Sequence, residues 1–364
     1  MMNILIDIGH PAHVHNYRNL AAELQQTGHR VIWTVKDIKV AQSLLKHYGF
    51  KFIVLPQKKD SLLGKILNQL QYDYILYRIC KREKVDIAIG SSATVAHVSA
   101  VSRVKSIVFD DDDDNVQPLV ARLVKPFVNT ILSPNTIIDK RSSTVLYPGY
   151  HELSYLHPNR FNPDPKVLAE VGLTIGEPYF IMRFNVFKAH HDIGVNGLSL
   201  DQKLRLVEAL KPYGKIFITT ERDIEPELKQ HQLSIAPEKI HSFMAYSTMF
   251  LGDSQTMTQE AAELGVPALK CNSFAGRLSV PNELEKKYGL IFSYLPEDFD
   301  SMLQKLNELL AMPNLKDEWQ QRRQKMLNDK IDVTAFWMWF VDNYPDSFSI
   351  IKVKPDEIFN NFKS

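Results

Sequence analysis

At 364 residues the chain is long enough for two domains with separate hydrophobic cores, and 45% apolar with 23% charged residues is typical of a soluble globular protein. A formal net charge of +1 gives no reason to expect a nucleic-acid partner. Because no segment reaches about 18 apolar residues without charge, a membrane-spanning helix is excluded, and the N-terminus is too short and polar for a signal peptide. We expect a cytoplasmic protein that can also contact a membrane surface.

The first half of the chain alternates between two patterns. Short apolar runs predict buried strands, and apolar residues at helical spacing between them predict helices. The predicted strands are 3–9, 31–35, 51–56, 85–90 and 106–110, and the predicted helices include 14–27, 61–81 and 93–102. Strands and helices that alternate with short connections predict a parallel sheet covered on both faces.

The second half repeats this scheme, with predicted strands at 179–184, 215–220, 248–253 and 266–271 and helices at 200–210 and 257–265. Between the halves, 156–165 contains three prolines, which oppose both helix and central strand and indicate a linker. We therefore expect an N-terminal Rossmann-like domain (1–158), a C-terminal one (166–330) and a helical segment (331–364) that packs back on the first. The predicted class is α/β, with the carboxyl ends of two parallel sheets facing across a cleft, where ligands of such sheets bind.

One strand-to-helix junction carries the most specific signal for a ligand. The segment LGDSQTMTQEAAELGVPAL (251–269) places Ser254 and Thr256 at the N-terminus of a helix, where free N–H groups and the helix dipole suit a phosphate. Glu260 lies one turn after Thr256, so its carboxylate could accept two ribose hydroxyls. The alternative from spacing alone is an ordinary capped helix with a solvated glutamate.

This segment resembles the nucleotide-sugar signature of GT-B glycosyltransferases, and it is similar to the bacterial peptidoglycan N-acetylglucosaminyltransferase and the non-hydrolysing UDP-N-acetylglucosamine 2-epimerases. Nearly the whole chain resembles a prokaryotic family of unknown function usually described as predicted glycosyltransferases, on the marks DIGHPAHVHNYRNL, FDD, MRFN and GDSQTMTQEAAELGVPAL. The resemblance implies a GT-B fold in which Glu260 holds the ribose and Ser254–Thr256 holds the diphosphate. Gln255 and Thr256 stand where the signature usually has a glycine pair, a departure that bears on how closely the backbone approaches the diphosphate.

The histidine-rich segment DIGHPAHVHNYRNL (7–20) follows the first predicted strand. The resemblance matches His13 to a histidine that faces the acceptor in inverting enzymes of this kind. A histidine can take the proton of an attacking sugar hydroxyl, so His13 is the candidate base, with substrate contact or a structural role as alternatives. His10 is a candidate substrate contact, and His15 is expected at the helix start, in contact with solvent.

The acidic run FDDDDDN (109–115) follows the last clear strand of the first half. Asp110 and Asp111, nearest the strand, are candidate catalytic residues that orient the acceptor or His13. Carboxylates at a strand end could instead hold a divalent metal, or those at 113–115 could cap the next helix. Because the two-domain plan resembles GT-B enzymes, in which helix dipoles and side chains carry the leaving diphosphate, we expect no metal.

Three more loops supply candidate contacts. Arg183, at the end of its predicted strand, could clamp a diphosphate with its guanidinium. Asn185 follows it in a loop that also contains Lys188 and two adjacent histidines, whose spacing does not suit zinc. Glu221 follows the strand at 215–220, and Arg277 follows the strand at 266–271, where it could contact the donor sugar.

The segment 58–84 is basic at both ends and has leucine and isoleucine residues on one side of its predicted helix. It is expected to face the core of the sheet. The alternative is a membrane-surface helix, which would suit a lipid-linked acceptor.

These patterns together predict a glycosyltransferase that moves a sugar from a nucleotide-diphosphate-sugar, UDP-linked by resemblance, to a hydroxyl on a saccharide or lipid-linked acceptor in surface polysaccharide or glycolipid synthesis. The nucleotide-sugar is a substrate, and no cofactor is expected. One alternative is an enzyme like the UDP-N-acetylglucosamine 2-epimerases, although the chain lacks their N-terminal Arg-Pro-Glu loop. The other is a non-catalytic nucleotide-sugar-binding protein.

Overall fold

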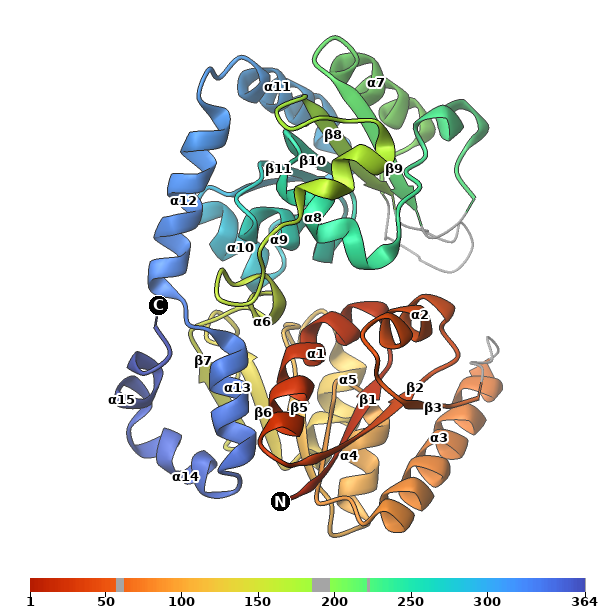
Figure 1. Cartoon of the computed structure of the whole chain (residues 1–364), viewed down its shortest axis with the longest axis vertical. Coiled ribbons are helices and arrows are strands. Elements are labelled where there is room, and N and C mark those ends of the chain that lie inside the picture. The colour runs from red at the N-terminus through yellow and green to blue at the C-terminus, as the bar shows by residue number, and fades with distance from the viewer. Residues whose placement is uncertain (57–61, 185–196, 221–222, 364) are drawn as a thin grey trace. The chain divides into compact units, whose positions relative to one another are not determined.

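The computed structural model describes residues 1–56, 62–184, 197–220 and 223–363 (Figure 1). The chain forms two compact units: unit 1 contains residues 1–160 and 330–364, and unit 2 contains residues 161–329. The C-terminal helical segment thus belongs to the same unit as the N-terminal half.

Unit 1 is built on a seven-stranded parallel sheet with the order β3-β2-β1-β4-β5-β6-β7. Its strands are β1 (Asn3–Ile8), β2 (Arg30–Val35), β3 (Phe52–Val54), β4 (Ile87–Gly90), β5 (Lys105–Phe109), β6 (Thr130–Pro134) and β7 (Thr144–Tyr147). The strands predicted for this half are confirmed. The strands β6 and β7 were not predicted. Their sequences, TILSP and TVLY, are short and contain only two aliphatic residues each, although both strands are almost wholly buried.

Helices cover both faces of this sheet. The helices are α1 (Pro11–Gln26), α2 (Lys39–His47), α3 (Leu62–Glu83), α4 (Ala93–Ala100), α5 (Pro118–Leu123), α6 (Leu153–Leu156), α13 (Val333–Asp342), α14 (Asp346–Val353) and α15 (Pro355–Asn360). On one face, α3 and α4 pack on strand residues such as Leu5 and Ala88. On the other face, Tyr17 of α1 and Trp337 of α13 contact the ring of Phe109, with centroids 5.3 and 4.2 Å away.

Helix α3 packs on the core of unit 1, and two leucines of the leucine-rich side that the sequence suggested are exposed. Tyr72, Leu76 and Ile79 are buried in the core of unit 1, at the spacing of one helical stripe. Leu67 and Leu70, which belong to the leucine-rich side, are 62% and 60% exposed. A search of the described residues for a helix that is both long and apolar enough to cross a membrane finds none.

Unit 2 is built on a five-stranded parallel sheet with the order β12-β11-β10-β8-β9. Its strands are β8 (Tyr179–Phe184), β9 (Lys215–Thr220), β10 (Met249–Gly252), β11 (Ala268–Cys271) and β12 (Ile291–Tyr294). Its helices are α7 (Leu200–Leu210), α8 (Ile240–Ala245), α9 (Gln255–Glu263), α10 (Ser279–Lys286), α11 (Phe299–Leu310) and α12 (Leu315–Asp329). The strands predicted for this half are confirmed, and β12 was not predicted.

Candidate functional site

The order of the strands selects one point in each sheet as the place for a ligand. In an open parallel sheet, ligands bind at the carboxyl ends of the two strands between which the direction of chain winding reverses. We call this place the switch point of the sheet. In unit 1 this point lies between β1 and β4, which are followed by residues 9–13 and by Ser91 and Ser92. In unit 2 it lies between β8 and β10, which end at Phe184 and Gly252.

A buried carboxylate holds the switch point of unit 1 together. Asp7 is fully buried near the end of β1 and accepts hydrogen bonds from Thr34 Oγ1 at 2.7 Å and Ser92 Oγ at 2.6 Å. Ser92 is also the N-cap of α4, where its hydroxyl accepts from Val95 N at 3.4 Å. Asp7 therefore joins β1, β2 and the start of α4, which fixes the loops that follow these strands.

His13 lies in the first turn of α1, half-buried. Its Nδ1 accepts a long hydrogen bond from Gly9 N at 3.4 Å, and its ring centroid is 6.0 Å from those of His10 and Tyr17. Burial, with smaller contributions from Lys36 and two neighbouring histidines, lowers the pKa of His13 to about 3. His13 is therefore neutral at pH 7, and the bond from Gly9 N places its own proton on Nε2.

The other two histidines of this segment have distinct positions. His10 is exposed and caps α1, since its Nδ1 accepts from Ala12 N at 3.2 Å. The expectation that His15 contacts solvent is wrong: its ring is buried, with its centroid 5.5 Å from that of Tyr155 and 6.2 Å from that of Tyr48. The helical repeat turns position 15 toward the protein, so His15 packs in the interior of unit 1.

Several polar residues beside His13 were not found by sequence reasoning. Tyr17 Oη lies 3.0 Å from Ser91 Oγ, which donates to the carbonyl of Phe109 at 2.7 Å. Lys36 follows β2, and its backbone N–H donates to Ile8 O at 3.1 Å. Lys36 and Ser91 directly follow predicted strands, so the rule that ligands bind at strand ends could have identified both.

His151 is the second buried histidine near this point. Its Nδ1 is 3.6 Å from Asp111 Oδ2, and burial lowers its pKa while Asp111 opposes that shift. Its ring stacks on Tyr147 and meets Trp337 edge-on, with centroids 6.4 and 5.5 Å away. No signal in the sequence marks His151, because it follows β7, which was itself missed.

The acidic run after β5 is held by two cations. Lys125 is buried and pairs with both Asp110 and Asp114, the latter at 2.6 Å, while Arg141 also pairs with Asp114. Burial raises the pKa of Asp110 to about 6, although Lys125 opposes the shift. Burial and the adjacent carboxylates raise the pKa of Asp112 to about 7.

These contacts contradict one of the alternatives for the acidic run. The idea that residues 113–115 cap the next helix is wrong, because α5 has Gln117 at its N-cap position and no side-chain cap. Asp114 binds cations instead. Within the part of the chain that the structure describes, no three carboxylates, histidines or cysteines are grouped so that they could hold a metal ion.

At the switch point of unit 2, β8 and β10 approach closely before α9 begins. Asp253 N donates to Arg183 O at 3.1 Å, and a Cβ on Gly252, whose φ is +155°, would lie 2.0 Å from that carbonyl oxygen. Glycine is thus required here by close backbone approach. The Arg183 guanidinium donates from Nη1 to Thr219 Oγ1 at 2.9 Å, which ties it to β9.

Helix α9 presents the predicted polar residues from its first turns. Ser254 is the N-cap and its hydroxyl accepts from Met257 N at 3.5 Å, whereas Gln255 and Thr256 are half-buried in the first turn. Glu260 is 4% exposed, and its Oε1 lies 2.9 Å from Nε2 of His241 in α8, which is also buried. The alternative of a solvated glutamate is therefore wrong, and no sequence pattern marks His241 as its partner.

The remaining predicted contacts fall in two groups. Arg277 is exposed in the turn after β11, which is joined to the α9 turn by a hydrogen bond from Asn272 Nδ2 to Asp253 O at 2.8 Å. Asn185 and Glu221 lie outside the described residues, as do Lys188 and the two histidines of the same loop.

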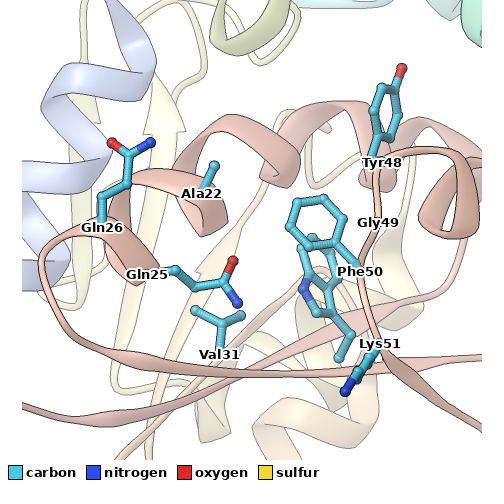
Figure 2. A pocket seen from close by; sticks show the side chains of 9 residues that line it. Ala22, Gln25, Gln26, Val31, Tyr48, Gly49, Phe50 and Lys51 are labelled. Carbon is cyan, nitrogen blue, oxygen red and sulfur yellow. The ribbon is translucent and has the colours of Figure 1, made fainter.

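Unit 1 also has a surface pocket of about 650 Å³. The last turns of α1, β2 and the α2–β3 connection line it, and Figure 2 shows Tyr48, Phe50 and Lys51 on the connection side. None of the residues at either switch point lines this pocket, so it is separate from the candidate site.

Comparisons with solved structures agree with this architecture. The S. aureus MnaA–UDP structure matches with a TM-score of 0.64 at 13% identity, covering 90% of this chain and 95% of that chain. The Neisseria meningitidis UDP-GlcNAc 2-epimerase bound to UDP-GlcNAc has a TM-score of 0.60 at 13% identity, covering 88% and 94%. The spinosyn forosaminyltransferase SpnP has a TM-score of 0.62 at 14% identity, covering 96% and 99%. At such identities the similarity shows the fold, which is that of GT-B glycosyltransferases and these epimerases.

A search of curated proteins by sequence finds no match. The family described as "Protein of unknown function (DUF354)" matches residues 2–334, so the chain belongs to this family.

Proposed function

We propose that this DUF354 protein transfers a sugar from a nucleotide-diphosphate-sugar donor to a hydroxyl acceptor in surface polysaccharide or glycolipid synthesis. One observation supports the proposal: Asp253 N, in the turn before α9, donates to Arg183 O at 3.1 Å, so the N-terminus of α9 lies beside the end of β8, and Glu260 follows on the same helix. This set offers helix N–H groups and a guanidinium for a diphosphate, and a carboxylate for ribose hydroxyls. The structural similarity to proteins solved with UDP and with UDP-GlcNAc supports the choice of a UDP-linked donor.

In this proposal the donor binds to unit 2. Its diphosphate lies at the N-terminus of α9, where Ser254, Gln255 and Thr256 offer side-chain contacts and Arg183 supplies positive charge. Glu260 accepts ribose hydroxyls, and its bond to His241 fixes the orientation of the carboxylate. The dipole of α9 and the Arg183 guanidinium stabilise the negative charge of the leaving diphosphate, so in this proposal the reaction needs no metal ion or cofactor.

The acceptor binds to the switch point of unit 1. Its hydroxyl oxygen forms a bond to the anomeric carbon, the bond from that carbon to the diphosphate breaks, and the hydroxyl proton passes to a base. In this proposal His13 takes this proton at Nδ1 in place of the long bond from Gly9 N, and the bound substrates have to raise its pKa from about 3 for the imidazolium to form. Asp110 and Asp111 orient the acceptor, Asp111 together with His151, and His10 contacts the substrate from the start of α1.

The second candidate function is sugar epimerisation. Its support is the likeness to UDP-GlcNAc 2-epimerases, together with two carboxyl groups, Asp110 and Asp112, whose raised pKa values suit acid–base work on a sugar ring. Against it stands the absence of the Arg-Pro-Glu sequence from the N-terminal loop.

One experiment separates these functions. The purified protein is incubated with a panel of nucleotide-sugars, with and without saccharide and lipid-linked acceptor pools, and products are identified by mass spectrometry and NMR. A transferase releases the nucleoside diphosphate and extends an acceptor. A new nucleotide-sugar epimer formed without acceptor supports the second candidate. Donor binding with no turnover in any mixture contradicts both and indicates a non-catalytic binding protein.

A further inference from the structure

Lys270 is a buried cation behind the first turn of α9. It lies in the middle of β11, between Gly252 of β10 and Ser293 of β12, and its side chain is fully buried. Its Nζ donates to Gln255 Oε1 at 2.7 Å, and Gln255 Nε2 in turn donates to Gln259 Oε1 at 2.8 Å. The ammonium group therefore sets the orientation of the first side chain of α9.

In the part of the chain that the structure describes, no ion pair joins Lys270 to an acidic group within 4 Å. The acidic residue that acts on it is Glu285 of α10, whose Oε1 accepts from Ser293 N at 3.2 Å. Burial lowers the pKa of Lys270 to about 8, and Glu285 opposes the shift. Burying an ammonium group costs free energy unless a group of opposite charge lies near it. An anion bound at the N-terminus of α9 would supply that opposite charge.

The Lys270–Gln255 pair also accounts for a departure noted in the sequence. Gln255 and Thr256 occupy the turn where a glycine pair would let a diphosphate approach the backbone closely. With Oε1 held by Lys270, the Gln255 amide keeps its NH₂ end on the α9 side, where one N–H reaches Gln259 and a second N–H remains to be donated.

We propose that Lys270 is a positioning residue of the donor site, which fixes the Gln255 amide as a hydrogen-bond donor to the diphosphate and adds a buried positive charge behind the N-terminus of α9. The inference rests on the proposed function, since it takes the diphosphate of a nucleotide-sugar as the ligand. Lys270 and Gln255 then act together with Arg183 and the N-terminus of α9 in distinguishing a diphosphate from an uncharged nucleoside. Lys270 forms no covalent bond in this role.

The test measures UDP and uridine affinity by titration calorimetry for the wild type, Lys270→Met and Lys203→Met. Methionine keeps the length of the side chain and removes only the charge and its hydrogen bond. Lys203 is the matched control, because it is a buried lysine of α7 in the same unit, paired with Glu225 at 2.6 Å. We expect Lys270→Met to weaken UDP binding roughly tenfold, the scale of one partly screened charge, and to leave uridine unaffected. Lys203→Met should match the wild type for both ligands.

The pH dependence gives a readout that a structural role would not change. The groups that act on Lys270 are Gln255 of α9, whose amide carries no titratable proton, and Glu285 of α10. The diphosphate of UDP is fully ionised between pH 7 and 9.5, since its terminal phosphate has a pKa of about 6. The uracil N3–H ionises toward the top of the range, so uridine is titrated in parallel at each pH. The ratio of UDP affinity to uridine affinity in the wild type should therefore fall from pH 7 to 9.5 as Lys270 loses its proton, whereas in Lys270→Met this ratio should stay flat.

The outcomes are separable from failure of the proposed function. A wild-type protein that does not bind UDP contradicts the donor assignment itself, and with it the role of Lys270. If the wild type binds UDP but Lys270→Met binds it equally well, only the role of Lys270 is refuted. Should Lys270→Met fail to fold, Gln255→Leu and the wild-type pH profile decide: unchanged UDP affinity in that variant, or a flat profile, overturns the inference.

Discussion

Removing the Glu260 carboxylate tests the donor site most directly. The carboxylate is 4% exposed, one turn into α9, and its Oε1 is 2.9 Å from Nε2 of the buried His241. In the proposed complex it also accepts ribose hydroxyls. The variant Glu260→Ala therefore removes both the ribose contacts and the acceptor that His241 uses, with separate consequences for binding and for stability.

The size of each effect follows from the number of hydrogen bonds lost. Hydrogen bonds to a charged group contribute about 1.5–3 kcal/mol each, so two lost ribose bonds weaken binding by about 3–6 kcal/mol, or at least about 100-fold in Kd. Removing the acceptor of a buried N–H costs about 1–3 kcal/mol of folding free energy. For a unit of this size, each kcal/mol lowers Tm by roughly 2–4 °C.

The assay is calorimetric titration of UDP into the wild type, Glu260→Ala and Glu260→Gln, with thermal unfolding of each. Glutamine keeps one oxygen for His241 and loses the charge and one acceptor, so its UDP affinity should fall between the other two while its Tm stays near that of the wild type. A folded Glu260→Ala protein that binds UDP with wild-type affinity would refute the donor-site assignment.

Three further predictions concern the proton acceptor, the acidic run and the backbone. His13→Ala should keep UDP affinity and lose at least about 100-fold in transfer rate, the scale of general base catalysis, and retained turnover would remove His13 from that role. The pKa of Asp110 is raised to about 6 in the folded protein, so the folded state holds this proton more tightly than the unfolded state does. The free energy of unfolding of the wild type should therefore fall relative to that of Asp110→Asn as pH rises from 4 to 7. Urea midpoints of the two proteins that run parallel over this range would contradict the shift. Gly252→Ala forces a Cβ to 2.0 Å from Arg183 O and should lower the free energy of unfolding, measured in urea, by more than about 3 kcal/mol. The control Gly276→Ala has open space around the Cβ but a φ of +73°, and it should lower this free energy by about 1 kcal/mol.

Sequence reasoning located the candidate site only where a strand end and a motif coincide. Asp110 and Arg183 lie at the ends of recognisable apolar runs, and His13 follows one closely. The position of these three residues near strand ends could therefore be predicted. His151 could not, because its position depends on β6 and β7, whose short mixed sequences do not differ from loops. Lys270 could not either, since a lysine inside an apolar strand carries no mark of the glutamine that it contacts.

The sequence by itself determined the local elements and the α/β class, because hydrophobic periodicity and turn residues act over a few positions along the chain. It also carried the motif at the start of α9, since a helix N-terminus is a local structure. Only the tertiary structure decided the strand orders that create the two switch points and the His241–Glu260 and His151–Asp111 pairs. The His241–Glu260 pair joins residues 19 positions apart, and the other features join residues that are farther apart still. Such contacts depend on which surfaces the sheet and its helices bury together, and local sequence patterns do not specify those surfaces.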